Sequence, residues 1–373
     1  MPGRVLIAAG GTGGHLFPAE ALAAALVARG WRVHLATDVR TEAYGRHFPA
    51  EEIHLVASAT LTRRPVAALR GLARLGRGFL QARRLIRRIA PDVAVGFGGY
   101  PTLPPMLAAA FAGVPTVIHE ANAVIGRANR FLAPRATRIA TSVADLRGGE
   151  RFRDRVVQTG NPVRPAVLKA AATPYPVRAA SDPFRLLVFG GSQGARYLSD
   201  LLPAAVSLLD ADARGRLRIV QQCRPEDLDR VDRAFRERHV DAGLKAFFDD
   251  LPDRIAASHL VVCRSGASTC TELAVIGRPA IMVPLPGALD QDQKANAMVL
   301  ERGGGGWMVA QRDMSPERLA ARLGELIAAP GRLAAAAAAA RGLARPDAVE
   351  RLADLAEATA ARKPAGVGAQ VPA

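Results

Sequence analysis

The sequence predicts an α/β protein with two Rossmann-like domains, each built on a mostly parallel sheet, that face a common cleft. The chain has 373 residues, and one domain usually takes about 100–200. Short β-branched runs alternate with helical patterns in both halves, which favours parallel strands joined by helical crossovers. The run RVLIAAGGTGG, from residue 4, is echoed by RLLVFGGSQG, from residue 185. Each half therefore begins with a strand, a glycine-rich turn and a helix, and ligands of such sheets bind beyond the carboxyl ends of the strands.

The first domain is predicted to cover residues 1–160. An Ala/Leu-rich helix with proline in its first turn is expected at 18–29, and a long basic helix at 65–89. The expected strands, in chain order, are 4–9, 31–36, 92–95, 116–119, 138–141 and 156–158.

A proline-rich linker is predicted at residues 161–184, which hold five prolines, and a second domain at 185–345. Its expected strands are 185–189, 216–221, 260–263 and 280–283. The alanine run at 334–340 is compatible with helix. We expect a helix at 346–362 that returns to the first domain, and a disordered tail at 363–373.

Composition excludes several classes of protein. With 49% hydrophobic and 23% charged residues the chain can build packed cores. Its three cysteines form no CxxC pair and lack zinc-like spacing with histidine, which argues against a disulfide framework and a structural zinc site and fits a reducing compartment. Residues 93–118 are uncharged, but prolines and glycines interrupt them. We therefore predict no transmembrane helix and no signal peptide.

The net charge is +16, and the excess is concentrated in the first half. Residues 61–90 contain nine arginines and no acidic residue. Such a stretch beside apolar side chains suits a phosphate-rich surface, either anionic lipid or nucleic acid. An arginine-rich composition of the whole chain is the simpler explanation of the high isoelectric point.

Two glycine-rich loops are candidate anion sites, because each follows a strand and precedes a helix. The loop GGTGGH spans residues 10–15 and GGSQGA spans 190–195. Neither a dinucleotide fingerprint nor a Walker loop is present in the first. His15 is either a proton acceptor or a structural histidine.

A third candidate site is CRSGASTCTE, residues 263–272, at the end of a strand and the start of a helix. Its small and hydroxyl residues would leave main-chain N–H groups open to a phosphate, and Glu272, about one turn into the helix, could reach a ribose. Helix capping by the Ser/Thr cluster is the ordinary alternative.

A set of motifs in this order resembles the MurG family, the GT-B N-acetylglucosamine transferases of peptidoglycan synthesis: GGTGGHLFP, GFGGYP, HEANAVIGRANR, GNPVR, FGGSQGAR, FFDDL, CRSGASTCTELA and DQDQKANA. The resemblance spans about residues 4–355. It implies a GT-B fold, with the sugar nucleotide on the second domain and a lipid-linked acceptor on the first. It also implies inverting transfer of GlcNAc from UDP-GlcNAc to the C4 hydroxyl of undecaprenyl-diphospho-MurNAc-pentapeptide, which converts lipid I to lipid II.

Residue roles follow from the same resemblance. It implies that Thr12, Gly13 and Gly14 line the site of the first domain and that Asn122 contacts the donor sugar. UDP would be held by Arg164, Ser192, Phe248, Ala267, Ser268, Thr269, Cys270, Thr271 and Glu272, with Glu272 on the ribose. Gln293 would contact GlcNAc hydroxyls. Ala121, Pro104, Pro105 and Asp292 depart from the family pattern, and these departures weaken the assignment of individual contacts.

The chemistry needs a base and a means of stabilising the departing diphosphate. His15 is the candidate base. Helix N-termini and Arg164 can stabilise the leaving group without a metal or cofactor. Asp290 and Asp292 spell a DxD pair, which binds a divalent ion in other glycosyltransferases, but a polar loop and helix cap explain them more simply.

The basic stretch is then expected to seat the first domain on the anionic cytoplasmic face of the bacterial inner membrane, as a peripheral protein. The residues of this predicted membrane patch are Arg63, Arg64, Leu69, Arg70, Leu72, Arg74, Leu75, Phe79, Arg83, Arg84, Arg87 and Arg88. The expected partners are UDP-GlcNAc, lipid I, this membrane surface and other proteins of cell-wall synthesis, with no nucleic acid.

Three alternatives remain open. A related GT-B enzyme could glycosylate another lipid, such as diacylglycerol. A nucleic-acid-binding protein would explain the isoelectric point near 11.1, although no helix-turn-helix, RNP or OB signature is evident. A dinucleotide oxidoreductase would need the fingerprint that the first loop lacks.

Overall fold

The structure, a computed structural model, describes residues 3–11, 13–38, 48–60, 65–191 and 194–361. The chain divides into two compact units. The first unit comprises Met1–Pro162 and Asp347–Ala373, and the second unit comprises Val163–Pro346. Each unit is described by itself below.

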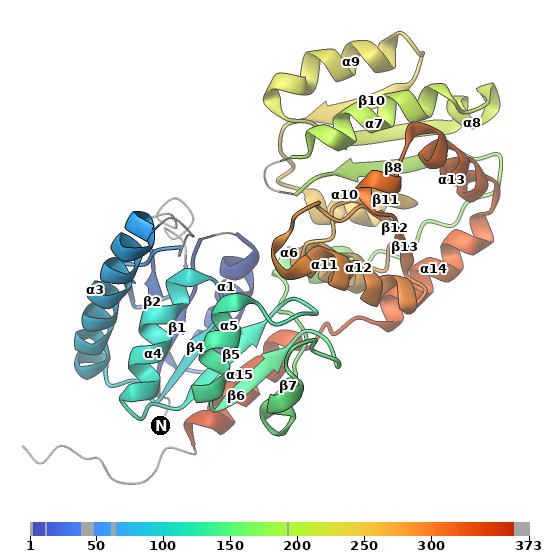
Figure 1. Cartoon of the computed structure of the whole chain (residues 1–373). Helices are drawn as coiled ribbons and strands as arrows, with labels where there is room; N and C mark the ends of the chain where they lie inside the picture. The colour runs from blue at the N-terminus through green and yellow to red at the C-terminus, as the bar shows by residue number, and fades with distance from the viewer. Residues whose placement is uncertain (1–2, 12, 39–47, 61–64, 192–193, 362–373) are drawn as a thin grey trace, which may run out of the picture. The chain divides into compact units, whose positions relative to one another are not determined.

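The first unit is built on a parallel sheet of seven strands in the order β3-β2-β1-β4-β5-β6-β7 (Figure 1). The strands are β1 Arg4–Ala8, β2 Arg32–Thr37, β3 Glu52–Leu55, β4 Val93–Gly96, β5 Thr116–Glu120, β6 Arg138–Thr141 and β7 Val156–Gln158. The helices are α1 Gly13–Ala28, α3 Pro65–Ile89, α4 Leu103–Phe111, α5 Arg127–Leu132 and α15 Ala348–Ala360.

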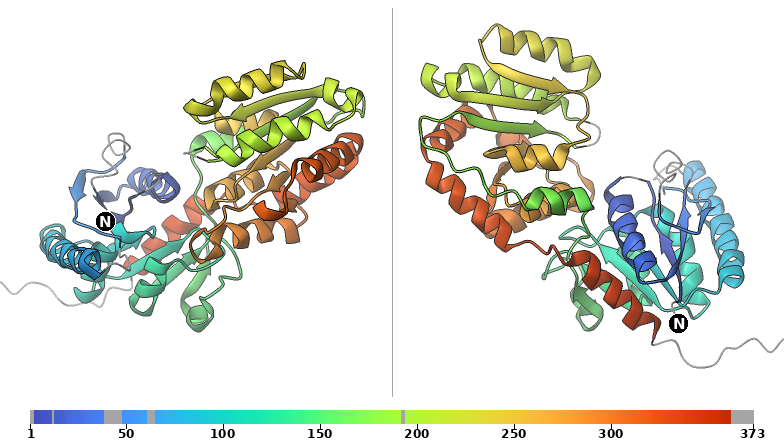
Figure 2. Two further views of the ribbon diagram at one scale, coloured as in Figure 1. Left: turned by 45° about the horizontal axis from the view of Figure 1, so that its top comes forward. Right: turned by 180° about the vertical axis from the view of Figure 1, so that it is seen from behind.

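Helices cover both faces of this sheet because its central strands are apolar on both sides. Val5, Ile7 and Val95 pack against α1 and α15, whereas Leu6 and Ala94 pack towards α3 and α4. Helix α15, from the end of the chain, lies beside α1 (Figure 2). The end of the chain thus completes the core of the first unit.

The second unit has a parallel sheet of six strands in the order β10-β9-β8-β11-β12-β13. The strands are β8 Phe184–Phe189, β9 Leu217–Gln222, β10 Asp241–Lys245, β11 Leu260–Cys263, β12 Ala280–Met282 and β13 Gly306–Met308. The helices are α6 Pro165–Ala171, α7 Arg196–Ser207, α8 Ala211–Arg216, α9 Leu228–Arg236, α10 Leu251–Ala257, α11 Ala267–Ile276, α12 Asp292–Arg302, α13 Pro316–Ala328 and α14 Pro330–Gly342.

This sheet also has a core on each face. Leu186 and Val188 point into the core that holds α7, α9 and α13. Leu187 and Phe189 point into the core that holds α6, α10 and α11. Both units are therefore three-layer α/β structures, as the alternating pattern predicted.

Three strands escaped the sequence analysis, and all three are edge strands: β3 ends the first sheet, and β10 and β13 are the two ends of the second. β3 and β10 contain charged residues, and β13 has only three residues. Helix α1 begins at Gly13 rather than at 18, so the glycine loop runs directly into its first turn.

The proline-rich stretch at 161–184 contains more structure than a linker needs. Pro165 occupies the first turn of α6, where its missing N–H is not required. Val167 is buried in a core of the second unit. The chain enters the second unit at Val163, before most of the prolines.

A search of the described residues finds no single helix long and apolar enough to cross a membrane. One bent pair, Pro316–Ala328 with Pro330–Gly342 at 96°, passes by length and composition when the two helices are taken together.

Candidate active site

The two glycine-rich loops lie where open parallel sheets bind ligands. In the first sheet β1 stands between β2 and β4, and in the second β8 stands between β9 and β11, so strand order reverses at these points. Ligands bind beyond the carboxyl ends of the strands at such a switch point. The loop at 10–15 follows β1, and the loop at 190–195 follows β8. Thr12 and Ser192 lie outside the described residues.

The first loop passes close to the ends of neighbouring strands. A Cβ on Gly10 would lie 3.0 Å from Thr37 Oγ1 and 3.2 Å from Asp38 Oδ1. Gly11 has φ 87°, a conformation that favours glycine. Gly13 and Gly14 open α1, so their N–H groups belong to the amino end of that helix.

His15 lies in the first turn of α1, against the loop that follows β4. A Cβ on Gly98 would lie 3.5 Å from Nε2 of His15, and one on Gly99 3.7 Å from the same atom. Burial lowers the pKa of His15 to about 4. The imidazole is therefore neutral near pH 7 and able to accept a proton, but it is a weak base unless a bound anion stabilises its charged form.

Glu120, at the end of β5, organises the HEAN segment and was missed by the sequence analysis. Its buried carboxylate accepts hydrogen bonds from the main-chain N–H of Asn122 (3.1 Å) and of Gly126 (2.9 Å). It also accepts from the side-chain amides of Asn122 (3.1 Å) and Asn129 (2.9 Å). Burial raises the pKa of Glu120, and these four donors oppose the rise. Glu120 thus holds Asn122, the residue predicted to contact the donor sugar, in place.

Next to it, His119 is buried and donates from Nε2 to the Gly160 carbonyl at 3.0 Å. Burial is the main cause that lowers its pKa to about 4, and the nearby His15 acts in the same direction. The two imidazoles therefore belong to one region of the first unit. The sequence HEAN places a histidine and an acidic residue side by side at the end of a predicted strand. This pattern could have marked His119 and Glu120 as candidate site residues.

In the second unit the glycine loop is tied to β9. The Gly190 N–H donates to Gln222 Oε1 at 3.1 Å, and Gln222 Nε2 donates to the Ala246 carbonyl at 3.2 Å. A Cβ on Gly190 would lie 2.4 Å from the main-chain nitrogen of Ala195. Only glycine fits at 190 without moving the loop.

The amino end of α11 is not capped by a side chain. Gly266 is the N-cap residue, and none of the described side chains makes a capping hydrogen bond. Two hydroxyls of this segment are engaged elsewhere: Ser265 donates to the Gln293 carbonyl at 2.8 Å, and Thr271 donates to the Ala267 carbonyl at 2.9 Å. The first-turn N–H groups of Ala267, Ser268 and Thr269 thus favour an anion site over the capping alternative.

Glu272 and Arg164, 108 positions apart, meet in the second unit. Arg164 Nη2 lies 3.5 Å from Glu272 Oε1. Glu272 is buried, which raises its pKa, while Arg164 opposes the rise. The guanidinium remains about one-third exposed. The pair offers a ligand one carboxylate and one cation beside the amino end of α11.

Other predicted contact residues are less exposed than their assigned roles suggest. Phe248 is buried in a core, with the Arg254 guanidinium 4.6 Å from its ring centre. Cys270 is buried too, which raises the pKa of its thiol to about 12. Neither side chain offers much surface to a ligand.

Gln293 is the second residue of α12, and its side chain is held by the main chain. Its Oε1 accepts from the Leu285 N–H at 2.9 Å, so the amide N–H₂ is the part of the side chain that can donate to a ligand. Just before it, Asp290 and Gln291 have positive φ angles of 56° and 55°. Asp292 Oδ1 accepts from the Gln293 N–H at 2.7 Å. The DxD pair thus shapes a strained turn and starts a helix.

The departures from the family pattern have local explanations. Pro104 and Pro105 occupy the first turn of α4, where no intrahelical N–H donor is needed. At position 121 the contact seen is made by the main chain: the Ala121 carbonyl accepts a hydrogen bond from the Ser142 hydroxyl at 2.7 Å.

The predicted membrane patch lies on α3, apart from Arg63 and Arg64, which are outside the described residues. Leu69 and Leu72 are 70% and 55% exposed. Leu75 is half-buried, and Phe79 packs edge-on against Phe111 at 5.9 Å. The arginines of the patch on α3 are exposed: Arg70, Arg74, Arg83, Arg84, Arg87 and Arg88. Among the described residues only Arg88 of this set has an acidic partner, Glu52 at 3.0 Å.

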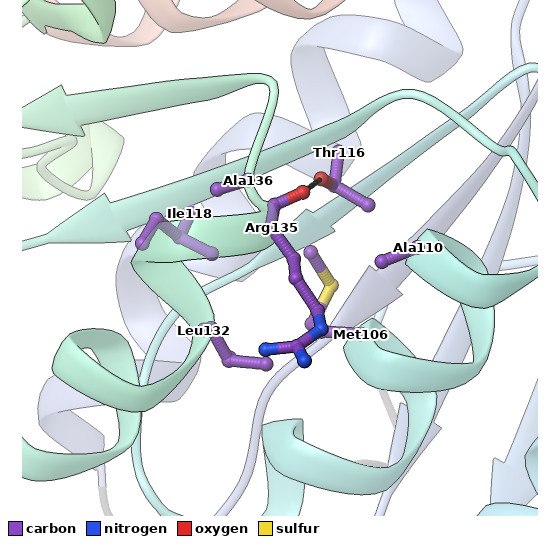
Figure 3. A pocket seen from close by; sticks show the side chains of 7 residues that line it. All are labelled: Met106, Ala110, Thr116, Ile118, Leu132, Arg135 and Ala136. Carbon is purple, nitrogen blue, oxygen red and sulfur yellow. Dashed lines mark hydrogen bonds between the residues drawn. The ribbon is translucent and has the colours of Figure 1, made fainter. Parts of the chain in front are cut away.

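A shallow hollow of about 170 Å³, including its part open to solvent, lies between α4, α5 and the strands beneath them (Figure 3). Met106, Leu132 and Arg135 line it, and Arg135 also lies 5.6 Å from the ring centre of exposed Phe111. Its lining is mostly apolar, with Thr116 and Arg135 as the polar members.

Comparisons with known proteins agree with this architecture. The chain matches the glycosyltransferase family 28 N-terminal domain over residues 5–141 and the family 28 C-terminal domain over 185–352. It is 60% identical to a UDP-N-acetylglucosamine–N-acetylmuramyl-(pentapeptide) pyrophosphoryl-undecaprenol N-acetylglucosamine transferase from Methylobacterium nodulans, across 95% of this chain and 96% of the relative. A protein of the same name from Chelativorans sp. is 56% identical, across 96% of each.

Solved structures give the same result. The crystal structure of Acinetobacter baumannii MurG is similar with a TM-score of 0.78 and 29% identity, covering 96% of this chain and all of that one. A Neisseria meningitidis UDP-GlcNAc 2-epimerase, at 13% identity and TM-score 0.64 over 94% of this chain and 98% of that one, shares the fold alone. The chain therefore belongs to the MurG family, and its two sheet-centred units are those of a family 28 glycosyltransferase with the GT-B fold.

Proposed function

We propose that the chain transfers N-acetylglucosamine from UDP-GlcNAc to undecaprenyl-diphospho-MurNAc-pentapeptide, converting lipid I to lipid II in peptidoglycan synthesis. The observation that carries this proposal is the 60% identity, over nearly the whole length of both chains, to a relative named for that reaction.

The second unit is proposed to bind the donor. The open amino end of α11 presents main-chain N–H groups, which suit a diphosphate, and the glycine loop after β8 follows a strand of the same sheet. Glu272 would accept hydrogen bonds from the ribose hydroxyls. Arg164, held beside Glu272 but one-third exposed, would then stabilise negative charge on the departing UDP.

The first unit is proposed to bind the acceptor through the amino end of α1. His15 would take the proton of the C4 hydroxyl as it attacks the anomeric carbon, with inversion of configuration. Its pKa of about 4 makes the free imidazole a weak base. A diphosphate bound at the loop next to it would favour the imidazolium form and bring the pKa closer to neutrality.

We propose further that α3 seats the first unit on the cytoplasmic face of the inner membrane. Val66, Leu69 and Leu80 are exposed, and at 100° per residue they share one face of the helix with Arg77, Arg84 and Arg87. A face with both apolar and cationic side chains is suited to an anionic bilayer. A lipid-linked acceptor would then be reached without leaving the membrane.

The test is an assay with labelled UDP-GlcNAc and a lipid I analogue, run beside a second arm with diacylglycerol as acceptor. Transfer to the lipid I analogue alone supports the proposal, and transfer to diacylglycerol alone overturns it. Glu272→Gln should raise the KM for UDP-GlcNAc by at least about tenfold, because it removes a charged hydrogen-bond acceptor. Glu325→Gln, on the exposed side of α13, is the matched control.

A further inference from the structure

An unassigned group of metal-binding side chains lies at the edge of the first sheet. It consists of His34 on β2 with Glu52 and His54 on β3. The register of the two parallel strands pairs His34 with Glu52 and Ala36 with His54. All three side chains therefore stand on the face that α3 covers. No other group of three such donors is found among the residues that the structure describes.

The distances between the donor atoms match a metal coordination sphere. Nε2 of His54 lies 3.4 Å from Nδ1 of His34 and 3.7 Å from Oε2 of Glu52. Zinc binds imidazole nitrogen at about 2.0–2.1 Å, so two nitrogens on a zinc tetrahedron are about 3.3–3.4 Å apart. The imidazole pair already has this separation, and the carboxylate is within a small side-chain movement of it.

Burial makes the group more than a chance surface cluster. His34 is buried, His54 is half-buried and Glu52 is exposed, so the group is closed on the protein side and open to solvent on the other.

Arg88 of α3 bridges two members of the group. Its Nη2 donates to Glu52 at 3.0 Å and to Nδ1 of His54 at 3.2 Å. Arginine has no acceptor, so His54 Nδ1 must accept and Nε2 carries the proton, which points to His34. A metal on Nε2 requires the other tautomer, with the proton on Nδ1, and so requires Arg88 to leave. Arg88 is 62% exposed and can swing into solvent.

We propose that His34, Glu52 and His54 form a site for one divalent transition-metal ion, with Zn²⁺ as the fitting ion and water as the fourth ligand. Two imidazoles, one carboxylate and an open position are a known zinc donor set. The ion would join the edge strand β3 to β2, and Arg88 competes with it for the same two side chains.

The experiment uses the full chain without a histidine tag, treated with chelator and then titrated with Zn²⁺ against a colorimetric chelator. We expect one ion per chain. His54→Gln and Glu52→Gln should each weaken binding by at least about 100-fold, beyond the 10- to 100-fold effect of losing an outer-shell partner. His239→Gln, an exposed histidine of the second unit, should bind as the wild type does.

Arg88→Ala separates a metal site from a simple hydrogen-bonded network. It removes the competing donor and should bind Zn²⁺ at least as tightly as the wild type, with the absorption spectrum of bound Co²⁺ reporting tetrahedral coordination. Circular dichroism checks that each variant is folded. If His54→Gln does not fold, Glu52→Gln, at an exposed position, is the variant that tests the site. Equal Zn²⁺ affinity in the wild type and the folded ligand variants overturns the proposal, as does failure of the wild type to bind Zn²⁺.

Discussion

Buried ionisable side chains determine the shape of the candidate site in the first unit. Glu120 is buried, and its carboxylate accepts hydrogen bonds from four N–H donors. The donors belong to Asn122, Gly126 and Asn129, the last of which is nine positions away in the sequence. A carboxylate can accept all of these hydrogen bonds with its two oxygens. A glutamine amide at this position would direct its N–H₂ group at some of the same donors and could not accept from them. The loop after β5 therefore depends on the charge of one side chain.

Glu120→Gln should lower the free energy of unfolding by about 1–3 kcal/mol, the cost of leaving a buried donor unsatisfied. It should also lower kcat/KM for UDP-GlcNAc, because Asn122 loses its fixed position. Urea unfolding and initial rates measure the two effects. Glu20→Gln, on α1 of the same unit, is the control. An unchanged stability in Glu120→Gln would mean that the four contacts do not hold the loop.

Stability should also depend on pH through His119. Its pKa is about 4 in the folded chain and about 6.5 when unfolded. Between these values the unfolded state binds more protons, so stability is full above pH 6.5 and is lost as the pH falls towards 4. From pH 7 to 5 the loss from this residue is up to about 2 kcal/mol. His119→Gln keeps an N–H donor for the Gly160 carbonyl but has no group that titrates in this range. It should therefore remove the contribution of His119 to the loss of stability, as measured by urea unfolding at pH 7 and pH 5. His239→Gln should leave the pH dependence unchanged.

At this scale the sequence could predict residue types but not contacts. The motifs marked Arg164 and Glu272 separately, yet only the fold brings them to 3.5 Å. Phe248 was expected on the ligand, but its ring fills a core because α10 and α11 pack around it. Gln222 and Arg264 support the loops of the second unit through the Gly190 N–H and the Val283 carbonyl. No motif marks such supporting roles, since they arise from tertiary packing.

At the scale of elements, α11 leaves its amino end open although a capping side chain would stabilise it. Gly266 has ordinary extended angles, φ −61° and ψ 153°, and a Cβ there would meet no atom within 4 Å. A Cβ atom therefore fits at this position. An uncapped end beside Arg164 and Glu272 is what a phosphate-binding helix requires.

Gly266→Asp should therefore move stability and function in opposite directions. The carboxylate would cap the helix and favour its dipole, adding a few tenths to about 1 kcal/mol to the free energy of unfolding. It would also repel a diphosphate, so the KM for UDP-GlcNAc should rise about tenfold or more. Gly266→Asn caps without charge and should stabilise the helix with a smaller rise in KM. If both variants leave KM unchanged, the diphosphate does not bind at α11.

Helix α3 carries the second prediction at this scale. Changing Arg77, Arg84 and Arg87 together to glutamate should weaken binding to anionic vesicles, because each basic residue near such a surface contributes about 1 kcal/mol. Arg233, Arg236 and Arg312 are exposed in the second unit, and the same triple change there is the control for net charge. Vesicle co-sedimentation at two salt concentrations measures both. Equal loss of binding in the two triples would point to total charge instead of α3.

The sequence predicted buried elements better than exposed ones. Apolar runs marked the central strands β1, β4, β8 and β11 to within about a residue. The edge strand β3 is mostly exposed, and β10 alternates exposed and half-buried side chains. Charged residues in both strands interrupt the apolar pattern that marks a buried strand. Each of these strands forms by pairing with the neighbouring strand of its sheet. The residues of the edge strand alone do not show which segment it will pair with.

At the scale of the whole molecule, the chain crosses between its two units twice, at Pro162–Val163 and at Pro346–Asp347. The first unit is consequently built from both ends of the chain. Leu352, Ala353 and Ala356 of α15 are almost fully buried in its core, beside α1 residues such as Leu26. Arg29, at the end of α1, adds ion pairs with Asp354 at 2.7 Å and Glu357 at 2.8 Å.

A chain ending at Pro346 should therefore lose stability in the first unit, although the cut removes nothing from the second. Uncovering the apolar face of α1 and losing a buried leucine, worth about 1.5–3 kcal/mol alone, should cost more than about 3 kcal/mol. The partly exposed ion pairs add little to this sum. Hydrogen exchange resolved by peptide would show faster exchange in α1 and β1 and unchanged exchange in β8 and β11. A chain ending at Ala361 keeps α15 and should behave as the full chain does. If the shorter chain exchanges no faster in α1, the first unit does not need the end of the chain, and α15 rests on a core that is complete without it.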